Sequence, residues 1–84
     1  MKILNKPVAM VATFDKDGNV TLVRFQLKDE NGENQTIKIE RFILKEKRKD
    51  VQKFHCLIIV NERKHQCEIW YRMEEVKFIL YSMN

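Results

Sequence analysis

Apolar residues recur at every second position in this chain, in short runs that are separated by clusters of turn-forming residues. Residues 20–28 show the pattern, with polar neighbours between three apolar residues: Val23, Phe25 and Leu27. A period of two residues is typical of a strand that buries one face. No window shows the 3.6-residue period of an amphipathic helix with a cap at both ends. The sequence therefore predicts a fold built from strands alone.

Six segments are predicted to form strands: Val8–Phe14, Val20–Lys28, Thr36–Lys45, Val51–Val60, His65–Arg72 and Lys77–Met83. The first is apolar on both faces, as expected of a fully buried strand. In the third, the alternation slips by one residue near Glu40 and Arg41, which predicts a β-bulge and a bend. Consecutive strands joined by short turns form an antiparallel meander.

The 84 residues of the chain suffice for one domain, residues 1–84. A twisted sheet of this size closes into a barrel, because closure removes unpaired edges. The expected fold class is therefore all-β, a small antiparallel barrel (SH3-like or OB-like) of five to six strands in a meander.

The hairpin of residues 51–72 has a predictable register. Asn61 and Glu62 are expected to form a two-residue turn, since asparagine tolerates positive φ. This turn places six residues on one face, which we expect to be the core: Phe54, Cys56, Ile58, Cys67, Ile69 and Tyr71. On the opposite face, His55 lies beside Glu68. A second turn at Glu74 and Glu75 is expected to place Trp70 opposite Ile79, and Glu68 opposite Tyr81.

Turn residues and core aromatics form a recognisable pattern: Phe14-Asp15-x-x-Gly18, Arg24-Phe25, Phe54-x-Cys56, Asn61, Cys67-Glu68-Ile69-x-Tyr71 and Phe78-x-Leu80-Tyr81. In this pattern the chain resembles a family of small, uncharacterised all-β proteins of Gram-positive bacteria. These are turn residues and core aromatics, so the resemblance implies an all-β fold and carries no known activity. The chain departs from the family pattern at Glu62, Cys67 and Phe78, where the family has glycine, tyrosine and tryptophan.

Two cysteines and two histidines are the residues most suited to hold a metal. In the predicted register Cys56, Cys67 and His65 share a face, but His55 points to the other face. A zinc site needs four converging ligands, so we expect two buried thiols, two surface imidazoles and no metal or cofactor. There is no glycine-rich phosphate loop and no serine placed as a nucleophile. The sequence therefore predicts that the protein is not an enzyme.

Positive charge is concentrated in one segment. Residues 41–64 contain eight basic and three acidic residues, whereas residues 1–40 contain six of each. A concentrated positive field favours polyanionic partners, and small barrels bind nucleic acid with basic grooves and exposed aromatics. The expected binding residues are Lys45, Lys47, Arg48, Lys49, Lys53, Arg63 and Lys64. Trp70 and Tyr81 are the candidate aromatics, with Lys53 expected beside Trp70.

The outer sheet face carries an apolar surface, which predicts an alternative function. The expected protein interface consists of Leu57, Ile59, Trp70, Ile79 and Tyr81. An exposed patch of this kind is typical of a protein contact, here with another protein or with a second copy of the chain. The sequence therefore predicts a binding module, with nucleic acid favoured over a protein partner or homodimer.

The sequence predicts a cytoplasmic protein. Its longest apolar run, Leu57–Val60, is far shorter than the roughly 20 residues that cross a bilayer. Polar residues interrupt the first apolar stretch from Asn5 onward and no small-residue cleavage site follows, so a signal peptide is not expected. Cys56 and Cys67 fit a reducing compartment as ordinary thiols.

Overall fold

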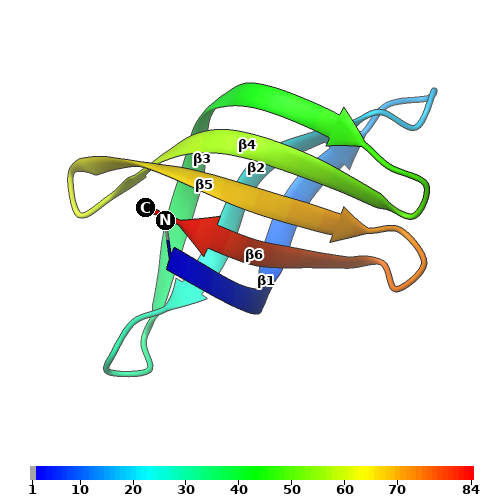
Figure 1. Cartoon of the computed structure of the whole chain (residues 1–84). Helices are drawn as coiled ribbons and strands as arrows, with labels where there is room; N and C mark the ends of the chain where they lie inside the picture. The colour runs from blue at the N-terminus through cyan, green and yellow to red at the C-terminus, as the bar shows by residue number, and fades with distance from the viewer. Residues whose placement is uncertain (1) are drawn as a thin grey trace.

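The computed structural model describes residues 2–84, which form six β-strands and no helix. The strands are β1 (Lys2–Phe14), β2 (Val20–Lys28), β3 (Asn34–Lys47), β4 (Val51–Val60), β5 (Arg63–Arg72) and β6 (Lys77–Met83). Each strand pairs antiparallel with the next, and β6 pairs with β1, which closes the barrel (Figure 1). The prediction of a small antiparallel all-β barrel in a meander is confirmed. Met1, which the predicted domain includes, lies outside the described residues.

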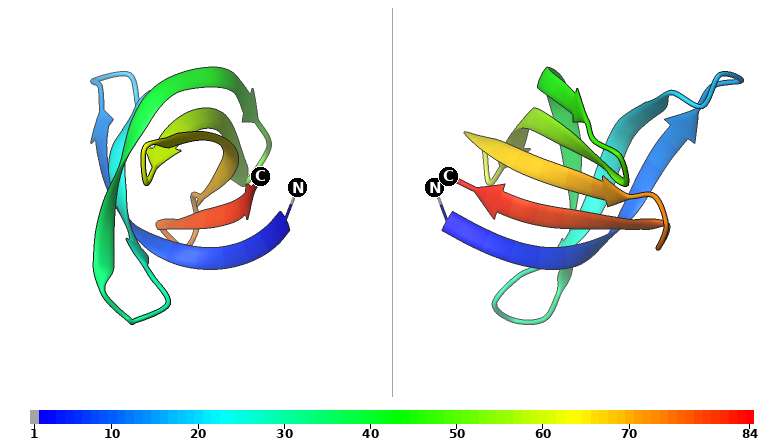
Figure 2. Two further views of the ribbon diagram at one scale, coloured as in Figure 1. Left: turned by 90° about the vertical axis from the view of Figure 1, so that its left-hand side faces the viewer. Right: turned by 45° about the vertical axis from the view of Figure 1, so that its right-hand side comes forward.

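The first strand is longer than predicted, and it is not buried on both faces. It begins at Lys2, and its first half pairs with β6 while its second half pairs with β2. As Figure 2 shows, β1 curves around the barrel and so contributes to both neighbouring ladders. Val11 and Phe14 are 45% and 54% exposed. The prediction of full burial was wrong because a single-layer barrel has one interior and no second sheet over its outer face.

The buried side chains of the barrel interior come from β2 to β6, and partly buried apolar residues of β1 pack against them. The largest fully buried apolar side chains are Phe25, Phe54, Ile58, Ile69 and Leu80. All six residues predicted to face the core of the β4–β5 hairpin are buried. In this hairpin the core follows the alternation of the sequence. In β2 it does not, because Leu22 and Phe25 are buried while Val23, predicted to share the face of Phe25, is skipped in the ladder with β1.

The register of the β4–β5 hairpin agrees with the prediction at every pair. Asn61 and Glu62 have positive φ values of 51° and 65°, as a two-residue type I′ turn requires. Val60 pairs with Arg63, and the ladder continues to Val51 opposite Arg72.

The β5–β6 ladder agrees with the prediction only in part. Trp70 lies opposite Ile79, but Glu68 lies opposite Ser82 and not opposite Tyr81. The register shifts between Glu68 and Ile69, so Tyr81 is an extra residue on β6. The predicted pairing of Glu68 with Tyr81 was therefore wrong.

Strand β3 changes partner along its length. Residues Asn34–Lys38 pair with β2, and residues from Ile39 to Lys47 pair with β4. The predicted bulge near Glu40 is confirmed by a register shift between Ile39 and Arg41, and a second shift follows between Phe42 and Leu44. Two bulges in quick succession bend the strand strongly, which carries its second half away from β2.

Val76 in the β5–β6 loop is strained. Its φ is 52°, and a β-branched residue in this region is a genuine outlier. Val76 is also 72% exposed, so its side chain adds little packing. We expect Val76→Gly to raise the free energy of unfolding by about 1 kcal/mol in denaturant titrations. Val76→Ala is the control, because alanine keeps the Cβ atom that opposes positive φ. An equal increase in the free energy of unfolding for Val76→Ala would contradict the interpretation that Val76 is strained.

Residues 2–84 include no helix of the length and apolar character needed to cross a membrane.

Candidate nucleic-acid interface

The seven predicted binding residues fall into two groups at opposite ends of β4. Five of them surround the β3–β4 turn and form what we call the basic corner: Lys45, Lys47, Arg48, Lys49 and Lys53. Arg63 and Lys64 begin β5, next to the β4–β5 turn. Because β4 has ten residues, at about 3.3 Å each the two turns lie roughly 30 Å apart (Figure 1). Arg63 and Lys64 therefore lie apart from the basic corner.

The basic corner presents positive charge on both faces of the sheet. Lys45 and Lys47 pair with Phe54 and Gln52, so their side chains are on the core side, although both are exposed. The Lys45 Nζ atom lies 5.5 Å from the centre of the Phe54 ring. Lys53 points outward on the opposite face. A polyanion that wraps around the turn could therefore meet cations on either side.

Acidic neighbours neutralise only part of this charge. Glu46 pairs with Arg48 at 3.6 Å and lies 3.8 Å from His55. Within residues 2–84, no ion pair shorter than 4.0 Å involves Lys47 or Lys49. Both lysines are exposed, so they remain available to phosphate groups.

Trp70 is held between two side chains on the outer face. The Lys53 Nζ atom lies 4.6 Å from the centre of the indole, which confirms the predicted contact. The Tyr81 ring stacks on Trp70 with centroids 4.1 Å apart and planes 9° apart. Lys53 comes from β4 and Tyr81 from β6, on opposite sides of β5, so the two groups occupy opposite faces of the indole. The Trp70 Nε1–H also donates to Glu68 Oε2 at 2.6 Å.

This arrangement corrects the prediction that Trp70 is an exposed stacking aromatic. A nucleobase stacks on an open ring face, and both faces of Trp70 already have partners. The predicted apolar interface is also smaller than expected. Ile79 is buried at 7% exposure, while Leu57 and Tyr81 are half-buried, and only Ile59 is exposed.

Exposed apolar residues occur on β3, outside the predicted interface. Phe42, Ile43 and Leu44 are 40%, 50% and 52% exposed. Successive side chains of a strand point to opposite faces, so three consecutive apolar residues cannot all face the core. This run was the signal in the sequence that an apolar side chain is exposed on β3. Phe42 also lies close to Lys45 along β3, and its ring is 5.8 Å from that of Phe54. Phe42 is therefore the aromatic that the basic corner offers to solvent.

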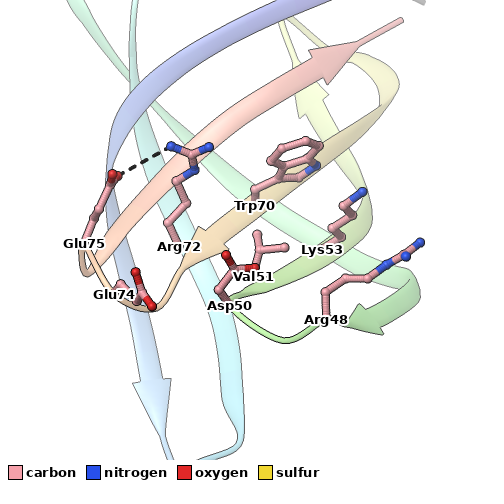
Figure 3. Close-up of a pocket in the computed structure, with 8 residues that line it drawn as sticks. All are labelled: Arg48, Asp50, Val51, Lys53, Trp70, Arg72, Glu74 and Glu75. Carbon is pink, nitrogen blue, oxygen red and sulfur yellow. Dashed lines mark ion pairs between the residues drawn. The ribbon is translucent and has the colours of Figure 1, made fainter.

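A pocket of about 530 Å³ lies on the outer side of the basic corner, between the β3–β4 and β5–β6 turns. It is lined by Arg48, Asp50, Val51, Lys53, Trp70, Arg72, Glu74 and Glu75. In Figure 3, the Arg72 side chain lies on the Glu75 side of Trp70, and the Lys53 and Arg48 side chains lie on its other side. Arg72 is paired with Glu75 at 3.7 Å. Three cations and three carboxylates balance, so the pocket adds no net positive charge to the interface.

The cysteines and histidines do not converge. Cys56 and Cys67 are opposite each other in the core as free thiols. A hydrogen bond with the Cys56 thiol, followed by burial, raises the pKa of Cys67 far above its ordinary value. His55 lies on the outer face, 3.2 Å from Glu68, while His65 Nδ1 is 2.6 Å from the Asn84 carbonyl oxygen. Within residues 2–84, no three His, Cys, Asp or Glu side chains form a group that could hold a metal.

Comparison of the chain with protein-family models, with curated proteins and with solved structures found no match. The resemblance to the Gram-positive family therefore stays a prediction. The geometry of the barrel surface is the basis on which a function can be proposed.

Proposed function

We propose that this barrel is a non-enzymatic module that binds nucleic acid at the basic corner. The observation that supports the proposal is the grouping of five basic side chains around the β3–β4 turn. Only Glu46 and Asp50 oppose them within residues 45–53. Such a cluster releases counterions when it meets the phosphates of a nucleic acid, which favours binding without regard to sequence.

The roles of the residues follow from their surroundings. Lys47 and Lys49 contact phosphates, because both are exposed and free of ion pairs within the described chain. Arg48 can join them by exchanging Glu46 for a phosphate. Phe42 offers a ring face to a base, whereas Trp70 does not. Arg63 and Lys64 are left out of the proposed site because of their distance from it.

The test is titration of a fluorescently labelled single strand at several salt concentrations. We expect a dissociation constant of about 10⁻⁴–10⁻⁶ M near physiological salt, the range of non-specific binding. The affinity should fall with salt, with a log–log slope of about 2–4, because three to five phosphate contacts each contribute roughly 0.7. Absence of binding at low salt would contradict the proposal.

A second candidate function is a protein contact, which the exposed Phe42, Ile43 and Leu44 favour. This contact replaces the Trp70 surface as the apolar interface, because the Trp70 ring faces are covered within the chain. An apolar contact depends little on salt, so salt dependence distinguishes the two candidates. Either function is assigned to the cytoplasm, where Cys56 and Cys67 remain reduced.

A further inference from the structure

The second half of β3 has one side without a strand partner. From Glu40 to Lys47 the strand pairs with β4 alone, because the pairing of β2 with β3 ends at Lys38. Residues 40–45 are all exposed. This half of β3 is therefore an open edge of the sheet within the described chain. An open edge presents backbone N–H and C=O groups that can pair with another strand.

The register shows which backbone groups face the open side. The two-residue turn makes Val60 and Arg63 a hydrogen-bonded pair, so even-numbered residues of β4 bond to β5 and odd-numbered residues bond to β3. Leu44 and Glu46 lie opposite odd-numbered residues of β4, so their backbone groups point to β4. The Arg48 N–H, which donates to the Val51 carbonyl oxygen at 2.8 Å, fits this alternation.

Three residues of this segment direct their backbone groups away from β4. Phe42, Lys45 and Lys47 lie opposite even-numbered residues of β4, whose hydrogen bonds are made with β5. Their own N–H and C=O groups therefore face the open side. Each would be paired if a further strand were added there.

Side chains along the open edge differ between the two faces of the sheet. Lys45 and Lys47 share the core-side face, and Leu44 is on the outer face. A strand added beside β3 would place alternate side chains next to these two groups. Acidic residues would meet the lysines and apolar residues would meet Leu44. The edge therefore favours an extended segment in which apolar and acidic residues alternate.

A second copy of the chain is a poor occupant of this edge. Antiparallel pairing of β3 with itself, centred on Lys45, places Lys45 opposite its own copy. Pairing centred on Glu46 places Lys45 opposite Lys47. Like charges directly opposite each other destabilise a ladder. The two bulges and the lysines thus discourage self-association, as charged edges do in natural sheets, while an acidic strand meets no such repulsion.

We propose that the open edge of β3 binds an extended acidic segment of a partner protein as an added antiparallel strand. This inference does not depend on nucleic-acid binding, because it rests on unpaired backbone groups rather than on charge alone. Main-chain hydrogen bonds supply the affinity, and the alternation of side chains supplies the selectivity.

Amide hydrogen exchange tests the geometry of the free protein. We expect the amides of Lys45 and Lys47 to exchange much faster than those of Leu44 and Glu46, which bond to β4. Addition of a binding peptide should then slow the exchange of the Lys45 and Lys47 amides. Equal protection of all four amides in the free protein would overturn the proposal.

A designed peptide tests the partner chemistry. The probe is a labelled peptide of alternating valine and glutamate, long enough to span Phe42 to Lys47, and we expect saturable binding to the full chain. In an antiparallel added strand, the glutamates lie opposite Lys45 and Lys47 and their N–H groups face β3. N-methylation of the glutamates should therefore abolish binding, whereas N-methylation of the valines should leave it intact. Equal binding of both methylated peptides would overturn the proposal.

Two variants of Lys45 separate backbone pairing from charge. Lys45→Gln removes the charge and keeps the N–H, whereas Lys45→Pro removes both without breaking the ladder to β4. We expect the proline variant to bind the peptide about tenfold more weakly than the glutamine variant. Thermal unfolding of both variants checks that each remains folded. Equal affinities, with displacement of the peptide by a single-stranded oligonucleotide, would overturn strand addition and assign the contact to a general polyanion site.

Discussion

Charge reversal at Lys47, Arg48 and Lys49 is expected to abolish nucleic-acid binding at physiological salt. The three residues supply most of the charge of the basic corner, and each glutamate replaces an attraction for phosphate with a repulsion. The expected wild-type dissociation constant is about 10⁻⁴–10⁻⁶ M, so binding is already weak and the loss of three contacts should make it undetectable. All three side chains are exposed, so the fold should be retained. Titration of a labelled single strand at low and physiological salt measures the effect.

Two controls make this result specific to the basic corner. Reversal of charge at Arg63 and Lys64, at the other end of β4, should lower the affinity much less. Trp70→Ala should leave the affinity nearly unchanged, because Lys53 and Tyr81 already cover the ring. Equal losses from both charge reversals would indicate a diffuse field rather than a site. A large loss from Trp70→Ala would show that the indole opens to meet a base.

The largest expected effect on stability comes from Phe54→Ala. Phe54 is fully buried and lies between Ile69 on β5 and the Phe42 ring on β3. Removing the ring leaves a cavity that the surrounding strands cannot fill, at a cost of about 3–5 kcal/mol. The total stability of a domain is typically about 5–15 kcal/mol, so the variant is expected to be marginally folded. Denaturant titration followed by far-UV circular dichroism measures the loss.

Phe14→Ala is the matched control for Phe54→Ala. Phe14 has the same side chain but is 54% exposed, and its ring forms an edge contact with Tyr71 at a centroid distance of 5.9 Å. Its replacement is expected to cost about 1 kcal/mol. If the two variants lost equal stability, Phe54 would not occupy the centre of the core.

Local patterns made most of the fold predictable. The alternation of apolar and polar residues determines which face of a strand is buried, and it correctly identified the core of the β4–β5 hairpin. The type I′ turn at Asn61 and Glu62 then determined every pair of that ladder, including Lys53 opposite Trp70. Both inferences depend only on residues that are close in the sequence.

Features that depend on barrel curvature were not predictable. The extra residue at Tyr81 and the second bulge of β3 adjust the strands to closure, and no local composition marks either position. The Tyr81 bulge also determines what surrounds Trp70, because it brings the tyrosine ring onto the indole. The prediction that the Trp70 ring is exposed was therefore wrong, although its strand and its position on the outer face were predicted correctly.

The candidate site was predictable where its residues are neighbours in sequence. The basic corner formed as expected because a turn keeps adjacent side chains together. Arg63 and Lys64 lie far from the corner because the whole length of β4 separates the two turns. The open edge of β3 could not be foreseen, since it arises from where β2 stops pairing.

The pairing of Lys2 with Met83 affects how this molecule must fold. Five of the six ladders join strands that are consecutive in the sequence, so hairpins can form independently and early. The ladder between β1 and β6 brings together residues from opposite ends of the chain, and its loop-closure entropy is compensated only once the intervening strands are ordered. Barrel closure is thus the step with the greatest sequence separation, which places refolding in the range of milliseconds to seconds that is typical of all-β domains.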